Sequence, residues 1–291
     1  MNKAAYNKSI KATGDSPLLF AGVWCPRALF LSLGNSTKKE GTMKTKMIVA
    51  FVGLLLICTS YAKADPIHEA ARNGDIHKVD KLIKEGSVLN AKDQYGQTAL
   101  HWASANGHMQ IVELLVKNGA VIDATSINGQ TPLHTAVGNI SIGKGHSDIV
   151  NFLLQHDANA NAKDNEGQTP LHWSAKFGHK NLLELLLAKG SNINEKSTDG
   201  RTALHGAAAK GFKDVVELLI TKCANINDRT TRGWTPLHLA ASTGQYEVAR
   251  LLIVKGAQIN PKEENGMTPL DWALRKNHAD IAALLRKHGA K

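Results

Sequence analysis

The chain has 291 residues and a formal net charge of +10, an excess that would suit a nucleic-acid partner if it covered the whole protein. It does not, because residues 65–291 carry 26 Lys and Arg against 23 Asp and Glu, whereas residues 1–64 carry nine against two. Of the three cysteines only Cys223 lies beyond residue 64, which excludes an internal disulfide in that part of the chain.

The segment that starts at Met43 has the three parts of a secretory signal peptide. Lys44 and Lys46 form a positive flank, residues 47–58 are apolar, and Ala62-Lys63-Ala64 is an A-x-A cleavage site. A spanning helix needs roughly 20 apolar residues, so we expect no stable membrane insertion after cleavage. The pattern predicts export by the secretory pathway, to the periplasm or the outside, with a mature start at residue 65. An uncleaved anchor and a coincidental apolar stretch remain alternatives.

Residues 1–42 precede this segment, although a signal peptide has to lie near the true N-terminus. We therefore interpret residues 1–42 as a non-native or disordered extension, with translation starting at Met43. The predicted organisation is an extension (1–42), a signal peptide (43–64) and one repetitive domain (65–291).

A four-residue motif recurs through the repetitive domain. Successive copies end at steps of 33, 38, 33, 33 and 33 residues. The copies are T-A-L-H at His101 and His205, T-P-L-H at His134, His172 and His238, and T-P-L-D at Asp271. A fixed period of this length predicts a solenoid of stacked units. Residues repeated in every unit are explained by stacking, which argues against one catalytic site.

Each unit predicts a turn followed by two helices. A turn signal such as Asp93-Gln94-Tyr95-Gly96 precedes the motif, whose threonine is a helix N-cap and whose proline suits the first helical position. A second helix follows with apolar residues at i, i+3 and i+4, for example Val215, Leu218 and Leu219, so we expect Leu218 to be buried. Glycine ends most second helices, but Asp157 and Cys223 take its place in two units, where a left-handed cap costs about 1 kcal/mol.

This combination resembles the ankyrin repeat, whose period is 33 and whose motif is T-P-L-H-x-A. The resemblance implies an all-α solenoid of about seven units, each with two antiparallel helices and a projecting β-hairpin. It also implies that the motif histidine binds the backbone of the adjoining hairpin. The units are 65–92, 93–125, 126–163, 164–196, 197–229, 230–262 and 263–291.

Both ends of the array carry polar replacements. Lys81 replaces an apolar residue of the first unit, Arg286 replaces one of the last unit, and Asp271 takes the place of the motif histidine. The ends of repeat arrays need polar outer faces. We therefore expect the array to be complete.

Candidate chemistry is sparse. Residues 138–145 look like a phosphate-binding loop, but glycine stands where Ser or Thr must bind magnesium and no strand precedes the segment. The histidines are spread over successive units without H-E-x-x-H or C-x-x-C spacing. Trp102, Trp173 and Trp272 share one position, which favours packing between units over a ligand site. We expect no enzyme activity, cofactor or metal.

The resemblance instead implies a protein-binding module, because ankyrin proteins bind mainly with hairpin tips and the exposed ends of the first helices, on the concave side. The expected partner surface is Tyr95, Asn128, Lys176, Phe177, Lys210, Arg232, Trp234, Met267 and Arg275. Its charge leans positive, which suits an acidic peptide and not duplex DNA.

We expect a monomer that binds a protein and no nucleic acid. A membrane-tethered or cytosolic scaffold is an alternative, and a solenoid that supports an enzyme or small-molecule site is an alternative of another class.

Overall fold

The structure, a computed structural model, describes residues 66–138 and 146–291. The predicted extension and signal peptide, and residues 139–145 of the loop-like segment, lie outside the described residues. The described part of the chain holds helices in pairs. They are α2 (Pro66–Asn73) and α3 (Ile76–Lys84), α4 (Ala99–Asn106) and α5 (Met109–Lys117), α6 (Pro132–Val137) and α7 (Ser147–Gln155), α8 (Pro170–Phe177) and α9 (Lys180–Ala188), α10 (Ala203–Lys210) and α11 (Lys213–Thr221), α12 (Pro236–Ser242) and α13 (Tyr246–Val254), α14 (Pro269–Arg275) and α15 (Ala279–Lys287).

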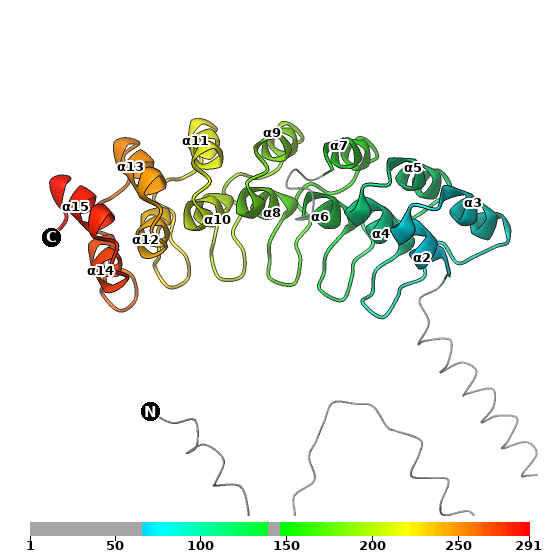
Figure 1. Ribbon diagram of the computed structural model, residues 1–291, viewed down its shortest axis with the longest axis horizontal. Coiled ribbons are helices and arrows are strands. Elements are labelled where there is room, and N and C mark those ends of the chain that lie inside the picture. The colour runs from blue at the N-terminus through cyan, green and yellow to red at the C-terminus, as the bar shows by residue number, and fades with distance from the viewer. Residues whose placement is uncertain (1–65, 139–145) are drawn as a thin grey trace, which may run out of the picture. The chain divides into compact units, whose positions relative to one another are not determined.

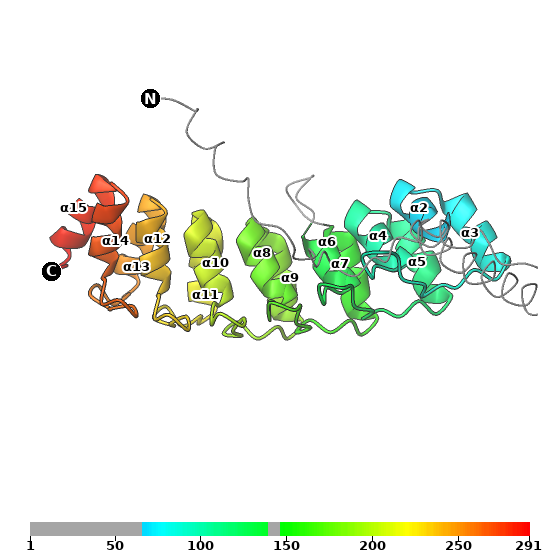
Figure 2. The same ribbon diagram turned by 90° about the horizontal axis from the view of Figure 1, so that it is seen from below.

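The helices form two rows. The even-numbered helices, the first of each unit, make an inner row, and the odd-numbered helices make an outer row above it (Figure 1). Each inner helix packs on the inner helix before and after it and on the outer helix of its own unit. The turns that join the units lie together along one edge of the array (Figure 2). Contacts between neighbouring units thus build the stack, which confirms the predicted solenoid.

In five of the units one leucine of the first helix lies at the centre of the core. The five equivalent residues Leu100, Leu133, Leu171, Leu204 and Leu237 are at most 1% exposed. The second helix of the same unit covers them with side chains such as Val216 and Leu219. The expectation that Leu218 is buried was wrong, since this side chain only packs on the edge of the core. The i, i+3, i+4 spacing of apolar residues shows which face of an outer helix is apolar, but not how closely the neighbouring outer helices cover that face.

The motif histidines bridge neighbouring units. In the unit of α10, His205 Nδ1 accepts a hydrogen bond from the Thr202 N–H (3.1 Å), so the proton lies on Nε2 and is donated to the carbonyl of Trp234 in the next unit (3.1 Å). The same two bonds occur at His101, His134, His172 and His238. This confirms the role that the ankyrin resemblance implied. Asp271 accepts a hydrogen bond from the Thr268 N–H (2.8 Å), but its carboxylate has no N–H group that could donate to another unit.

Burial keeps these histidines neutral. Loss of solvent contact lowers the pKa of His101 and of His205 from 6.5 to about 4, although the hydrogen bond to the next carbonyl raises it. The same cause lowers the pKa of His134, His172 and His238. A neutral ring is the state that the geometry needs, because Nδ1 must accept.

The expected β-hairpins are turns without strands in residues 66–138 and 146–291. Each turn closes on itself, as the Ser197 N–H does on the Arg201 carbonyl (2.9 Å). Each also donates one backbone hydrogen bond to the turn before it, for example from the Thr231 N–H to the Asp199 carbonyl (2.9 Å). One bond between neighbours is too few for a sheet ladder.

Asparagines in the loops that precede the turns add a second connection between units. Asn161 Oδ1 accepts from the Asn192 N–H (2.8 Å), and Asn194 Oδ1 accepts from the Asn225 N–H (3.0 Å). Asn227 Oδ1 accepts from the Gln258 N–H in the same way (2.8 Å). These bonds satisfy backbone donors that the irregular loops would otherwise leave unpaired.

Lys81 and Arg286 are exposed, so the polar replacements do lie on the surface. No helix in the described ranges is long and apolar enough to cross a membrane.

The cap after α11 gives a first testable prediction. Cys223 has a φ of 66°, a left-handed conformation that Gly119 and Gly190 adopt at the equivalent position. Cys223→Gly should therefore raise the free energy of unfolding by about 1 kcal/mol, since glycine lacks the Cβ clash. Urea denaturation measures the change. Thr221→Gly, inside the last turn of α11, is the control and should destabilise.

Candidate protein-binding groove

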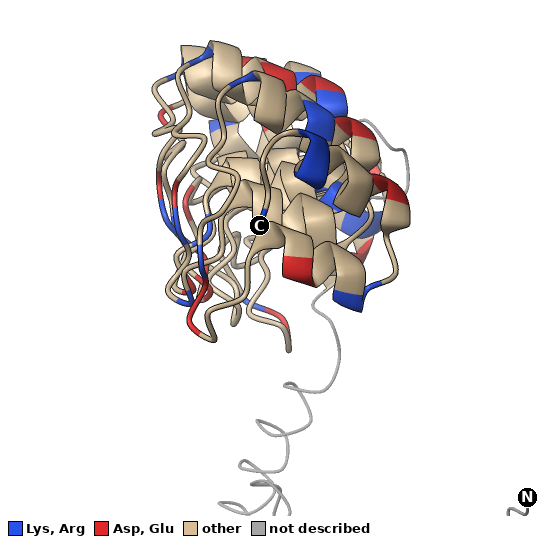
Figure 3. Ribbon diagram, turned by 90° about the vertical axis from the view of Figure 1, so that its left-hand side faces the viewer, with Lys and Arg blue, Asp and Glu red and all other residues tan. Residues whose placement is uncertain are grey.

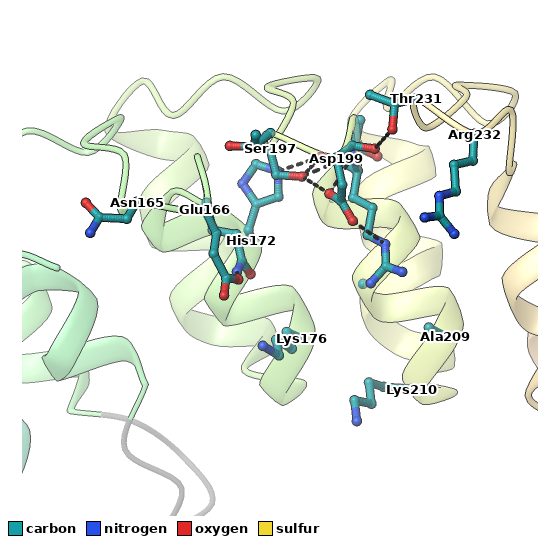
Figure 4. Close-up of a pocket in the computed structure, with 15 residues that line it drawn as sticks. Asn165, Glu166, His172, Lys176, Ser197, Asp199, Ala209, Lys210, Thr231 and Arg232 are labelled. Carbon is teal, nitrogen blue, oxygen red and sulfur yellow. Dashed lines mark hydrogen bonds and ion pairs between the residues drawn. The ribbon is translucent and has the colours of Figure 1, made fainter. Parts of the chain in front are cut away.

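A hollow lies between the turns of three units and the inner helices α8 and α10. It has a volume of about 670 Å³. Turn residues such as Asp199 and Thr231 form its upper wall, and Lys176 and Lys210 extend from the ends of α8 and α10 below (Figure 4). We call this hollow the inner groove. It is an open depression lined mainly by polar side chains, which suits a peptide chain more than a buried small molecule.

A glycine of α10, Gly206, lines the inner groove. Gly206 of α10 directly follows His205, at the position that Trp102, Trp173 and Trp272 occupy in other units. Each of those three tryptophan rings is half-buried. A Cβ placed on Gly206 would make ordinary van der Waals contact with Lys176 of α8, whose nearest atoms lie at 3.8 Å. Gly206 lines the hollow and carries no side chain that could fill it.

Some of the charged side chains that line the inner groove form ion pairs and others do not. Asp199 bonds Arg201 (3.0 Å), and Arg232 lies 3.7 Å from Glu264. Lys176 and Lys210 are exposed, and neither is within ion-pair distance of a described carboxylate. Elsewhere positive and negative side chains are interspersed over the turns and outer helices (Figure 3). The groove floor thus carries two unpaired positive charges.

A second hollow of about 400 Å³ continues the groove toward α12. It shares part of its lining with the inner groove and adds Trp234, Leu239 and Ser242. The shared residues are Asp199, Arg201, Thr231 and Arg232. The two hollows therefore form one path that runs from α8 to α12.

The structure brings some of the predicted surface residues together. Lys176, Lys210 and Arg232 line the inner groove, and Trp234 lines its continuation. Met267 and Arg275 meet one unit later, where the Arg275 Nη1 donates to the Met267 sulfur (3.7 Å). Tyr95, which is 57% exposed, and the exposed Asn128 lie on earlier turns, away from both hollows.

Two of the predicted anchors also support the fold. The Trp234 ring packs on Trp272 with centroids 4.6 Å apart, and Phe177 meets Trp173 edge-on at 6.0 Å. Both rings are half-buried against aromatic neighbours, so replacing Phe177 and Trp234 with alanine should lower stability as well as binding.

Two of the tryptophans after the motif are tied into their own units. Trp102 Nε1 donates to Asp93 (2.8 Å), and Trp173 Nε1 donates to Asp164 (3.1 Å). The guanidinium of Arg72, from the preceding unit, lies over the Trp102 ring at 5.0 Å. These contacts agree with the predicted packing role.

No group of three or more His, Cys, Asp or Glu side chains in the described ranges is placed to hold a metal ion. Cys223 is exposed at a helix cap.

Sequence reasoning missed Gly206, although the signal was present. The residue after the motif histidine is large or branched in the other complete units, and only alignment of the units shows that Gly206 departs from this pattern. Ser197 and Thr231 were missed because turn residues of this kind read as ordinary turn formers.

Gly206→Ala should stabilise the protein by about 0.5 to 1 kcal/mol, because glycine inside a helix has a larger unfolded-state entropy than alanine. The added Cβ would make only ordinary contacts. Thermal unfolding measures the effect. Gly211→Ala is the opposite control, since its φ of 80° is left-handed and that variant should lose stability.

Comparison with known proteins agrees with this architecture. A family model described as ankyrin repeats (3 copies) matches residues 67–164, 140–230, 175–263 and 204–291. The crystal structure of the human ASB11 ankyrin repeat domain is similar, with 31% sequence identity and a TM-score of 0.68, over 77% of this chain and 98% of that one. The search of curated proteins found no match. Because the family matches run from residue 67 to residue 291 and follow the stacked units, the chain belongs to the ankyrin-repeat family.

Proposed function

We propose that this protein is a non-enzymatic binding module that holds a protein partner along its concave side, between the turns and the inner helices. Ankyrin repeats are generally protein–protein interaction modules. The observation that carries the proposal is the path of two hollows from α8 to α12, whose charged side chains the fold does not require. The site, and not the fold, selects the partner.

Several features favour a protein over other ligands. A small-molecule site is usually enclosed and mostly apolar, whereas this path is open and spans several units. Duplex DNA would need a strongly basic face, but residues 65–291 carry nearly equal numbers of positive and negative side chains. The protein acts as a monomer in this proposal, and its groove remains free for the partner.

Photo-crosslinking tests the binding face. A photoreactive amino acid is placed at the turn positions Asn128 or Arg232 of the full chain, and at Lys117 or Lys189 on the outer row as controls. We expect one protein from a cell extract, identified by mass spectrometry, to be crosslinked from the turns and not from the outer row. Crosslinks from the outer row alone would place the interface elsewhere.

We also propose that the protein is exported and works in the periplasm or outside the cell. The signal-peptide pattern of residues 43–64 supports this. Cell fractionation should recover the protein outside the cytosol, and N-terminal sequencing should start at residue 65. A native product that retains Tyr6 or Trp24, or that stays in the cytosol, would contradict export.

A further inference from the structure

We propose that the inner groove takes an extended acidic segment of the partner, with a glutamate side chain inserted over Gly206 between Lys176 and Lys210. This inference rests on the proposed function and adds the chemistry of the partner.

Two small residues of α10, Gly206 and Ala209, line the inner groove. In other units this space is filled from the helix itself, as Trp102 fills it beneath Arg72. A side chain from outside can therefore lie over Gly206, in the hollow that α8, α10 and the turns line.

The charges select the kind of side chain. Lys176 and Lys210 border the hollow from two neighbouring helices without a described carboxylate partner. Of the two acidic residues of the lining, Asp199 pairs with Arg201, whereas Glu166 accepts a hydrogen bond from the neutral amide of Gln168. A carboxylate between the two lysines gains two ion pairs, and the four cationic side chains of the lining outnumber its two acids.

The direction of the path suggests an extended segment. Arg232 and Arg201 line both hollows, so a chain that leaves the lysines toward α12 passes further positive side chains. The protein's own N-terminal residues do not match this surface, because residues 1–64 carry nine Lys and Arg against two acids. The complementary occupant is an acidic segment of another protein.

Gly206 is less favourable inside a helix than alanine, and a packed tryptophan at this position is compatible with the fold in three other units. The proposed role explains why α10 carries the less stable residue beside the groove.

The test uses the full chain and a fluorescein-labelled peptide of alternating Glu and Ala, with the matching Gln and Ala peptide as the uncharged comparison. Fluorescence anisotropy measures affinity. We expect the Glu peptide to bind and the Gln peptide to bind at least about tenfold more weakly. Affinity for the Glu peptide should fall as salt concentration rises.

Variants separate the shape from the charge. Gly206→Trp fills the hollow with the residue found in other units and should lower the affinity for the Glu peptide about tenfold. Gly206→Ala should leave this affinity within about twofold of the unchanged protein. Lys176→Glu with Lys210→Glu should weaken binding about a hundredfold. Lys189→Glu with Lys222→Glu makes the same charge change at exposed ends of α9 and α11 and should have little effect. Thermal unfolding confirms that each variant is folded.

Three results would overturn the proposal. They are failure of the Glu peptide to bind, binding that survives Gly206→Trp, and displacement of the peptide by inorganic phosphate at an ionic strength where sodium chloride has no effect. The last would assign the lysines to a phosphate ligand. If the Glu peptide does not bind while the turns still crosslink a partner protein, only the proposal of an acidic segment is wrong. If the peptide does not bind and the turns crosslink no partner, the proposed function is wrong as well.

Discussion

Leu204→Ala should lower the free energy of unfolding by about 2 to 5 kcal/mol, the range for truncating a fully buried leucine. The Leu204 side chain has no solvent exposure and lies in the middle of the array, between α8 and α12. Truncation leaves a cavity. The neighbouring inner helices cannot close it without disturbing the hydrogen bonds that their motif histidines make to the next unit. Because residues 65–291 contain only one cysteine, no disulfide can compensate.

Urea denaturation measures this loss, and Leu218→Ala is the matched control. The same atoms are removed from the same unit, but Leu218 is only half-buried, so we expect a smaller loss. Equal losses for the two variants would contradict the assignment of Leu204 to the centre of the core.

Acid should destabilise the array between about pH 6.5 and pH 4. Burial lowers the pKa of His101 and of His205 from 6.5 to about 4. Between these values the unfolded chain binds protons that the folded chain does not, so the free energy of unfolding decreases as the pH falls. From pH 7 to pH 5 each of these two histidines should remove about 2 kcal/mol. The lowered pKa values of His134, His172 and His238 act in the same direction.

Urea midpoints measured from pH 7 to pH 4 test this expectation. His205→Gln should make the dependence on pH less steep, since one group that takes up a proton on unfolding is gone. The change of His156, which is exposed at the end of α7, to Gln controls for the loss of a histidine as such. A midpoint that stays constant down to pH 4 would contradict the burial of neutral rings.

The sequence allowed the repeating parts of this fold to be predicted, because each is set by local chemistry. The Thr202 cap and the left-handed Cys223 follow from residue types at fixed offsets within a unit, whereas the bridging role of His205 was implied by the resemblance to ankyrin repeats. The period of 33 residues then placed the same features in every unit.

Features that depend on how units meet could not be predicted in this way. The contact of Trp234 with Trp272 joins two units, and the exposure of Leu218 depends on how closely the outer helices approach. The inner groove depends on a residue that is absent, since Gly206 is informative only when compared with tryptophan in sister units. The positions of Lys176 and Lys210 were predicted, but the hollow between them was not.

The backbone hydrogen bonds between neighbouring turns bear on how the protein can evolve. Both partners of each bond are main-chain atoms, as in the pair formed by Thr231 and Asp199. Any side chain except proline can be exchanged at the donor position without removing the bond. Natural variation can therefore exchange the side chains of one turn at a time, while the backbone connection that keeps neighbouring turns in register is inherited unchanged.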